Sequence, residues 1–243
     1  MSPTSSPPRR FRLIRRVAVV TAAVAMVGVG QAAFGTVGVS ADPAADCADV
    51  LVEDHDEQTV TVTGDCTTGT AIVVPDGFTL IGADGGATIT AIASGTAAFG
   101  PIIRNAGYTM HVQDLEIVAH INGGSRPSGD RADRLAGITF HDAGGSVTDT
   151  SVSTVRSGGQ LGGQEGYGVH VISTGEAPDP VTLTGLDVDG YQKTGVMVWG
   201  EVDVTLTGST IDSSHIGDVQ ASNSVTFGNG ASGTIADNEI TGN

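Results

Sequence analysis

A short sequence pattern (small, apolar, any, apolar) recurs through the second half of the chain. It reads GITF at 137–140, GVHV at 168–171, GVMV at 195–198 and SVTF at 224–227. The copies start 31, 27 and 29 residues apart, a repeat length typical of solenoid proteins. Apolar positions that alternate with a period of two indicate a β-strand, and no segment after residue 42 has a sustained helical periodicity. The pattern therefore predicts an all-β solenoid.

A second pattern follows most copies of the first and predicts a tight bend. Its five copies are VQDLEI (112–117), VTDTSV (147–152), LTGLDV (183–188), LTGSTI (206–211) and IADNEI (235–240). The third position always holds a residue that tolerates left-handed backbone geometry, namely Asp114, Asp149, Gly185, Gly208 and Asp237. We expect a positive φ at this position in every coil.

The charge distribution excludes one class of partner. The formal net charge is −16, but five of the 11 basic residues lie within the first 16 residues, and all 27 acidic residues lie after residue 41. The remaining chain therefore carries six basic against 27 acidic residues. A surface this acidic repels phosphate backbones, so we expect no binding to nucleic acid.

Residues 1–41 have the features of a signal peptide. Residues 1–16 are basic without any acidic residue, and residues 17–30 are almost entirely apolar. The small residues at VSA predict cleavage after Ala41, with Ala32 and Ala33 as earlier alternatives. We expect a secreted or extracellular protein, free or attached to the cell envelope, with no membrane contact after cleavage. The alternative is an uncleaved anchor over residues 17–39, and the export route stays open.

Cys47 and Cys66 are the only cysteines, and both lie near the start of the exported chain. Export exposes them to oxidising conditions, so we expect a disulfide that fastens an N-terminal cap segment, 42–58, over the first coil. Two free thiols are the alternative. A metal site is disfavoured because no Cys-x-x-Cys motif or histidine cluster accompanies the pair, and we expect no metal ligands.

Residues 59–243 are expected to form the repeat domain, and parts of it carry a family resemblance. The segment VPDGFTLIGADGGATI (74–89) resembles the opening coils of right-handed parallel β-helix proteins of the pectin-lyase-like superfamily. The segments GYQKTGVMV (190–198) and GNGASGTIADNEITGN (228–243) resemble repeats of secreted, actinobacterial-type β-helix proteins. The resemblance implies a right-handed parallel β-helix with a polysaccharide cleft on one face. Ca²⁺ enters as a cofactor by this resemblance alone.

Three arginines lie in one insertion between strands. Arg126, Arg131 and Arg134 make up half of the basic residues after the signal peptide. We interpret them as a clamp on a carboxylated sugar, because guanidinium groups bind carboxylates in a bidentate geometry. The alternative is a solvated loop in which they pair with Asp130 and Asp133.

The strand register predicts which side chains share the outer face. Its two columns are Thr139, His170, Met197 and Thr226, and His141, Ile172, Trp199 and Gly228. Arg104 is expected to join from the preceding coil. We expect an exposed Trp199 indole, beside His141 and His170, to stack on a sugar ring; the alternative is that a long loop covers it. Lys193, the sole lysine, is a candidate base or a plain turn residue.

Catalytic signatures of the resembled enzymes are missing. Polygalacturonase-type enzymes carry Asn-Thr-Asp and Gly-His-Gly motifs and pectate-lyase-type enzymes a Trp-Ile-Asp-His motif, and none occurs in this sequence. We therefore assign no catalytic residue. We expect a non-catalytic module that binds polysaccharide on an elongated face, and the alternative is a lyase or glycoside hydrolase that acts on an acidic glycan.

The final coil presents an apolar end layer. This layer is expected to contain Val225, Phe227, Ile235 and Ile240, next to a row of backbone groups with no further strand to pair with. We expect one of two explanations: a longer open reading frame, or end-to-end self-association at this coil.

Overall fold

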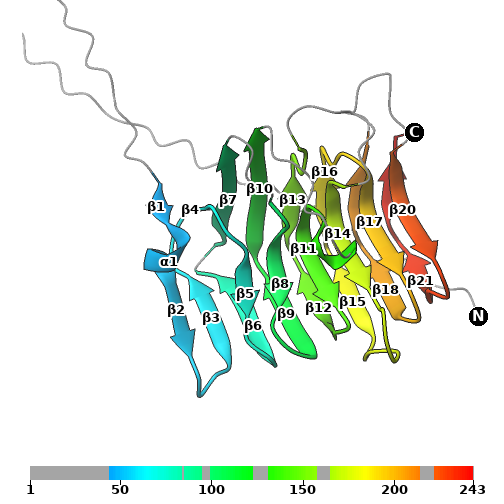
Figure 1. Ribbon diagram of the computed structural model, residues 1–243, viewed down its shortest axis with the longest axis horizontal. Helices are drawn as coiled ribbons and strands as arrows, with labels where there is room; N and C mark the ends of the chain where they lie inside the picture. The colour runs from blue at the N-terminus through cyan, green and yellow to red at the C-terminus, as the bar shows by residue number, and fades with distance from the viewer. Residues whose placement is uncertain are drawn as a thin grey trace, which may run out of the picture. The chain divides into compact units, whose positions relative to one another are not determined.

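Each coil of the chain contributes one strand to each of three sheets, as Figure 1 shows. The computed structural model describes residues 44–83, 85–94, 99–122, 131–157, 165–213 and 222–242. The expected signal peptide, Arg126 and Asp130 lie outside these residues. From β3 onward, strands of successive coils pair in parallel in all three sheets. The prediction of an all-β solenoid is confirmed.

The three sheets are named here in the order in which a coil visits them. The first sheet contains β5 (Ile72–Val74), β8 (Pro101–Asn105), β11 (Ala136–His141), β14 (Tyr167–Ile172), β17 (Thr194–Trp199) and β20 (Asn223–Gly228). The second contains β2 (Leu51–Asp54), β3 (Thr59–Val62), β6 (Phe78–Gly82), β9 (Thr109–Gln113), β12 (Gly144–Thr148), β15 (Val181–Thr184), β18 (Asp203–Thr207) and β21 (Ser232–Ala236). The third contains β1 (Ala45–Asp46), β4 (Cys66–Thr68), β7 (Ala87–Ser94), β10 (Leu115–Asn122), β13 (Ser151–Ser153), β16 (Asp187–Asp189), β19 (Thr210–Asp212) and β22 (Glu239–Thr241).

Aliphatic side chains of one sheet position stack on one another along the inside of the solenoid. In the first sheet the column is Ile103, Ile138, Val169 and Val196. The second and third sheets supply Leu80, Val112, Val147, Leu183 and Leu206, and Ile89, Ile117, Val152, Val188 and Ile211. Every one of these side chains is at most 1% exposed, so burial of these columns supplies the main stabilisation of the fold.

The bend between the second and third sheets has the geometry that the sequence predicts. The residue at the bend has φ 53° at Asp114, 47° at Asp149, 67° at Gly185, 60° at Gly208 and 57° at Asp237. Left-handed backbone costs little for glycine and least among the other residues for aspartate and asparagine. The prediction of a positive φ in every copy is confirmed.

Glycine at equivalent positions of β11, β14 and β17 lets the third sheet pack directly against the first. A Cβ atom added to Gly137, Gly168 or Gly195 would collide with an interior side chain of the third sheet, in turn Val152, Val188 and Ile211. The small first residue of the GVMV-type pattern is therefore a packing requirement, because a larger side chain would push the two sheets apart.

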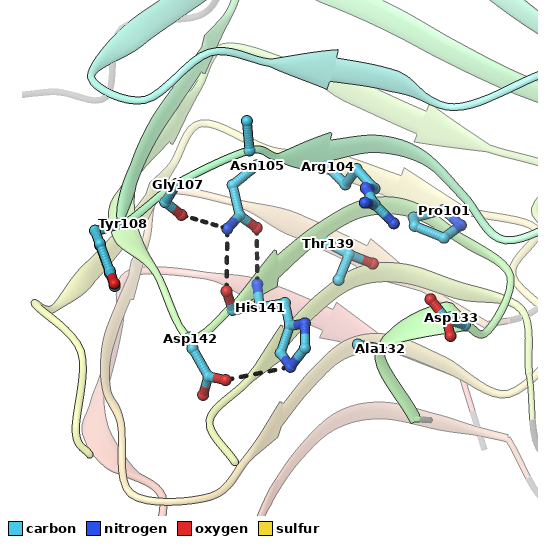
Figure 2. A pocket seen from close by; sticks show the side chains of 11 residues that line it. Pro101, Arg104, Asn105, Gly107, Tyr108, Ala132, Asp133, Thr139, His141 and Asp142 are labelled. Carbon is cyan, nitrogen blue, oxygen red and sulfur yellow. Dashed lines mark hydrogen bonds and ion pairs between the residues drawn. The ribbon is translucent and has the colours of Figure 1, made fainter. Parts of the chain in front are cut away.

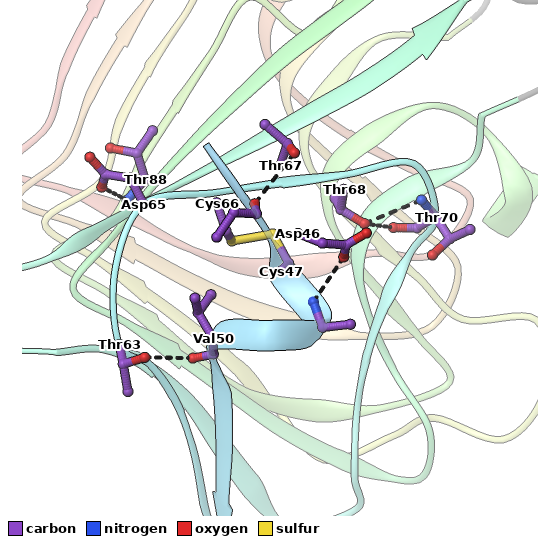
Figure 3. The surroundings of a disulfide bond; sticks show 12 residues. Asp46, Cys47, Val50, Thr63, Asp65, Cys66, Thr67, Thr68, Thr70 and Thr88 are labelled. Atoms are coloured by element: carbon purple, nitrogen blue, oxygen red, sulfur yellow. Dashed lines mark hydrogen bonds between the residues drawn. A yellow bond between two sulfur atoms is a disulfide. The ribbon is translucent and has the colours of Figure 1, made fainter. Parts of the chain in front are cut away.

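The N-terminal end is closed by a short hairpin and a disulfide, shown in Figure 3. Helix α1 (Cys47–Val50) begins after Asp46, whose side chain accepts a hydrogen bond from Ala48 N. Strand β2 then runs antiparallel to β3. Cys47 on α1 is bonded to Cys66 on β4, and Cys66 pairs with Ile89 in the interior column of the third sheet. The predicted disulfide is confirmed.

The last coil leaves part of the apolar interior column in contact with solvent. Ile235 is 47% exposed and Ile240 is 43% exposed, while Val225 and Phe227 are half-buried. Among the residues that the structure describes, no helix is long and apolar enough to span a membrane.

The substitution Gly168→Ala tests the packing requirement. The new methyl group would meet Val188 Cγ1 and would lie 2.6 Å from the Gly195 carbonyl oxygen. We expect the free energy of unfolding to fall by about 3 kcal/mol, since overpacking a rigid interior costs about 1–3 kcal/mol. The control is Gly175→Ala, where the added Cβ atom meets nothing within 4 Å, and we expect a change within about 0.5 kcal/mol. Denaturant titration that gives equal losses for both variants would contradict the requirement.

Candidate functional site

The outward face of the first sheet carries the two columns that the sequence predicts. Thr139 pairs with His170, His170 with Met197, and Met197 with Thr226. Beside them run His141, Ile172, Trp199 and Gly228 in register. Arg104 on β8 pairs with Thr139. The predicted register of this face is confirmed.

A single helical turn, η1 (Arg131–Asp133), contacts β11 and β14 and divides this face. Thr139 and His170 are consequently only 1% and 2% exposed. The His170 ring packs against the Tyr167 ring with a centroid distance of 4.7 Å, and Arg134 Nη1 donates to the Tyr167 hydroxyl at 3.0 Å. Of these two predicted ligand residues, His170 is buried and Arg134 is half-buried.

On one side of η1 lies a hollow of about 360 Å³, called here the Arg104 hollow (Figure 2). Its polar lining comes from Arg104 and Asn105 on β8, Thr139 and His141 on β11, Asp142 after it, Asp133 of η1, and Tyr108. In the view of Figure 2, Thr139 lies between Arg104 and the His141 ring. Thr139 Oγ1 has no hydrogen-bond partner among the described residues. A buried hydroxyl without a partner is rare and marks a place where water or a ligand group can bind.

Three short polar side chains tie neighbouring coils together at the rim of this hollow. Asn105 donates to the His141 carbonyl at 3.0 Å and accepts from His141 N at 2.9 Å. Asp76 accepts from Tyr108 N at 2.7 Å and from Thr109 N at 2.9 Å. Sequence reasoning missed this role of Asp76 and Asn105, although their position at the end of a strand, Asn105 as the last residue of β8 and Asp76 two residues after β5, was the available signal.

The third of these side chains, Asp142, holds the turn of the next coil. Its carboxylate accepts from Thr174 N at 2.6 Å, Thr174 Oγ1 at 2.8 Å and Gly175 N at 3.3 Å, and its Oδ2 lies 3.2 Å from His141 Nε2. Burial by itself raises the pKa of Asp142. The hydrogen bonds from Thr174 and Gly175 and a protonated His141 outweigh it and hold the pKa below its ordinary value of 3.8.

On the other side of η1 lies a second hollow of about 310 Å³, called here the Trp199 hollow. The Arg131 guanidinium carbon stands 4.0 Å from the centroid of the Trp199 ring, a cation–π contact. Trp199 is half-buried, and one face of its ring carries the Arg131 guanidinium. Ser173, 5% exposed and with no partner for Oγ among the described residues, lies in the lining, as do Thr174 and Glu201.

Two of the predicted arginines make no ion pair with any residue that the structure describes. Arg104 lines the first hollow and Arg131 the second, and no carboxylate of the described ranges lies within ion-pair distance of either. The alternative in which Arg131 pairs with Asp133 is therefore not what the structure shows. Arg126 and its neighbour Asp130 lie outside the described residues.

The remaining candidate, Lys193, lies away from both hollows. Lys193 is half-buried, and its backbone N donates to the Gly166 carbonyl at 2.9 Å; it lines neither hollow. Within the described ranges, no group of three or more histidine, cysteine or acidic side chains is arranged to hold a metal ion. The face offers hydrogen bonding and charge pairing through Arg104, Arg131 and buried hydroxyls.

The substitution Asp142→Asn tests the turn-holding role. Because the pKa of Asp142 is lowered on folding, the ionised carboxylate stabilises the folded state above its ordinary pKa, and this stabilisation is lost as the pH falls through the folded pKa. We expect the variant to be about 1 kcal/mol less stable than the natural protein at neutral pH, a value reduced by solvent screening. The difference should shrink in denaturant titrations at about pH 3. Glu176→Gln in the same turn is the control, and a pH-independent difference for Asp142→Asn would contradict the assignment.

The face is therefore characterised by its own side chains: two unpaired arginines, two buried hydroxyls and a carboxylate that orders a turn. Its function has to be inferred from these groups. Comparison of the chain with protein-family models, with curated proteins and with solved structures finds no match in any of the three.

Proposed function

We propose that the protein is an exported module that binds an acidic polysaccharide along the outward face of the first sheet. The observation that carries the proposal is the pair of unpaired arginines, Arg104 and Arg131, each at a hollow of the same face. Neither arginine forms an ion pair with any carboxylate among the residues that the structure describes, and two such cations on one face favour an external anion. Guanidinium groups bind carboxylates through paired N–H donors.

The geometry suits a ligand made of repeated units. Arg104 is on β8 and Trp199 on β17, three strand steps away, which is about 14 Å at a strand spacing of about 4.8 Å. Arg131 lies over the Trp199 ring, and a guanidinium stacked in this way keeps its in-plane N–H groups available. Thr139 and Ser173 add hydroxyls inside the two hollows. A polymer that carries carboxylates at intervals can contact both arginines.

The net negative charge of the chain disfavours binding of nucleic acid. It does not disfavour binding of an acidic polysaccharide at the two hollows. Charges more than about 8 Å away are largely screened at physiological salt, so the nearby arginines dominate the potential in each hollow. Nucleic acid needs many consecutive phosphates neutralised, which two arginines cannot supply.

Binding to polygalacturonate and alginate, with a neutral glucan for comparison, tests the proposal. We expect Arg104→Gln and Arg131→Gln each to raise the dissociation constant about tenfold, a loss of about 1.4 kcal/mol. Lys193→Gln removes the same charge away from both hollows and is the matched control, with no change expected. Equal binding of the neutral glucan, or unchanged binding in both arginine variants, would overturn the proposal.

A lyase or hydrolase acting on an acidic glycan is the second candidate, and one observation favours it. His141 lies beside the carboxylate of Asp142, and both line the hollow that contains Arg104 and Asp133. A histidine oriented by a carboxylate is a common proton-transfer group, and an arginine would hold the substrate carboxylate. Release of unsaturated or reducing uronate ends, measured with and without Ca²⁺, separates the two candidates. Product release that is lost in His141→Gln would establish the enzyme.

We further propose that the solenoid winds to the right and belongs with the pectin-lyase-like β-helices, on the basis of the resemblance in residues 74–89 and 190–198. Crossovers between parallel strands are right-handed in nearly all proteins. Secreted or cell-envelope localisation is supported by the Cys47–Cys66 disulfide, since such bonds persist in oxidising compartments.

Self-association at the last coil is proposed from its exposed apolar side chains. Ile235 and Ile240 lie on adjacent sheets and are both more than 40% exposed, and an unpaired strand edge favours pairing with another edge. We expect light scattering to show a concentration-dependent dimer that Ile240→Lys converts to monomer. A natural protein that stays monomeric at high concentration would contradict this proposal.

A further inference from the structure

The outward face of the second sheet repeats one kind of side chain in two directions. One column contains Thr59, Thr79, His111, Ser146, Thr182, Thr205 and Thr234. The neighbouring column contains Thr61, Ile81, Gln113, Thr148, Thr184, Thr207 and Ala236. Six positions of the first column and four of the second carry a hydroxyl group. The register makes these columns continuous from β3 to β21.

These columns carry no acidic residue, although the rest of the chain is rich in them. The outward positions of the third sheet, by contrast, include Glu116, Asp187, Asp189, Asp212 and Glu239. Two acidic residues lie on the outward face of the second sheet, Asp54 on β2 beside Thr59 and Asp203 on β18 beside Ser232, and both are outside the two columns. The columns themselves present mainly hydroxyl and methyl groups, without a carboxylate.

The columns are accessible. All fourteen residues are half-buried or exposed, with Thr182 and Thr234 in the exposed class. The longest connections between strands, residues 123–135, 154–166 and 213–222, all join the third sheet to the first. Figure 1 shows β6, β9, β12, β15, β18 and β21 side by side.

The hydroxyls stand at two regular repeats. Coils follow one another at about 4.8 Å, and residues two apart on a strand are about 6.7 Å apart. Neighbouring groups hold one another in place: Thr184 Oγ1 is 3.2 Å from Thr207 Oγ1, and His111 Nδ1 is 2.8 Å from Ser146 Oγ. The result is a grid of hydroxyl and methyl groups, interrupted at Ile81, His111, Gln113 and Ala236, whose two repeats approximate those of the water oxygens on the prism face of hexagonal ice.

We propose that this face binds ice. Hydroxyl groups at a fixed repeat hold water molecules at the same repeat, and the threonine methyl groups between them exclude water that would break the order. Charged side chains would organise their own hydration shells, and the two columns contain none except a titratable His111. A crystalline polysaccharide is a less suitable ligand, because sugar faces are bound by aromatic rings and no aromatic side chain other than His111 occurs in the columns.

Ice shaping and inhibition of ice recrystallisation by the exported protein test the proposal. We expect faceted ice crystals with the natural protein and at least a tenfold higher concentration for the same inhibition with Thr182→Lys, which places a charge in the middle of the grid. The matched control is Thr210→Lys on the outward face of the third sheet, which should leave inhibition unchanged. Thr205→Val keeps the side-chain shape and removes one hydroxyl, and a smaller loss is expected. Far-UV circular dichroism shows whether each variant is folded.

Several outcomes would overturn the proposal. Unshaped ice with the folded natural protein is one, and full inhibition retained by folded Thr182→Lys and Thr205→Val is another. Retention on crystalline cellulose or chitin that depends on Thr182 would assign the face to a polysaccharide instead. The face is separate from the two hollows of the first sheet, so these outcomes do not depend on the binding of acidic glycans.

Discussion

Parallel hydrogen bonding of each coil to the next determines which residues meet in this protein. Because the register is kept from coil to coil, a residue type at one position of the repeat becomes a continuous column. Inside the solenoid the columns are aliphatic and almost completely buried, and this burial offsets the loss of chain entropy. On the outside, the same register repeats one position of the coil along the whole solenoid, so the residue type at that position determines the chemistry of a whole face.

Features encoded within a few residues could be predicted from the sequence. Alternating apolar positions identified the strands and the outward columns, including the pairing of Arg104 with Thr139. The bend residues were identifiable because left-handed backbone is sterically accessible to few residue types, as the φ of 47° at Asp149 illustrates. Two cysteines in a chain with an expected signal peptide left one simple pairing. In each case the structural requirement involves residues close together in the sequence, so the local sequence is enough to predict it.

Features that depend on where an insertion lies could not be predicted in the same way. The sequence placed Trp199 on the outer face and Arg131 in an insertion, but it did not show that the Arg131 guanidinium lies over the indole. It also gave no sign that η1 buries Thr139 and His170. Trp199 and His170 lie more than thirty positions from η1 in the sequence, and an insertion has no repeat that would reveal its path. For the same reason, the sequence did not reveal the hydrogen bonds between Asp142 and the turn at Thr174.

The one-residue bend between the second and third sheets has a consequence for how such a chain can change. A bend that fits only one left-handed residue leaves no room for insertion, so a coil can lengthen chiefly where the third sheet passes to the first. Additions at that corner can remodel the face of the first sheet while the second keeps its spacing. One solenoid can therefore acquire new specificity along one side and preserve a regular grid along another, as two surfaces with separate evolutionary histories.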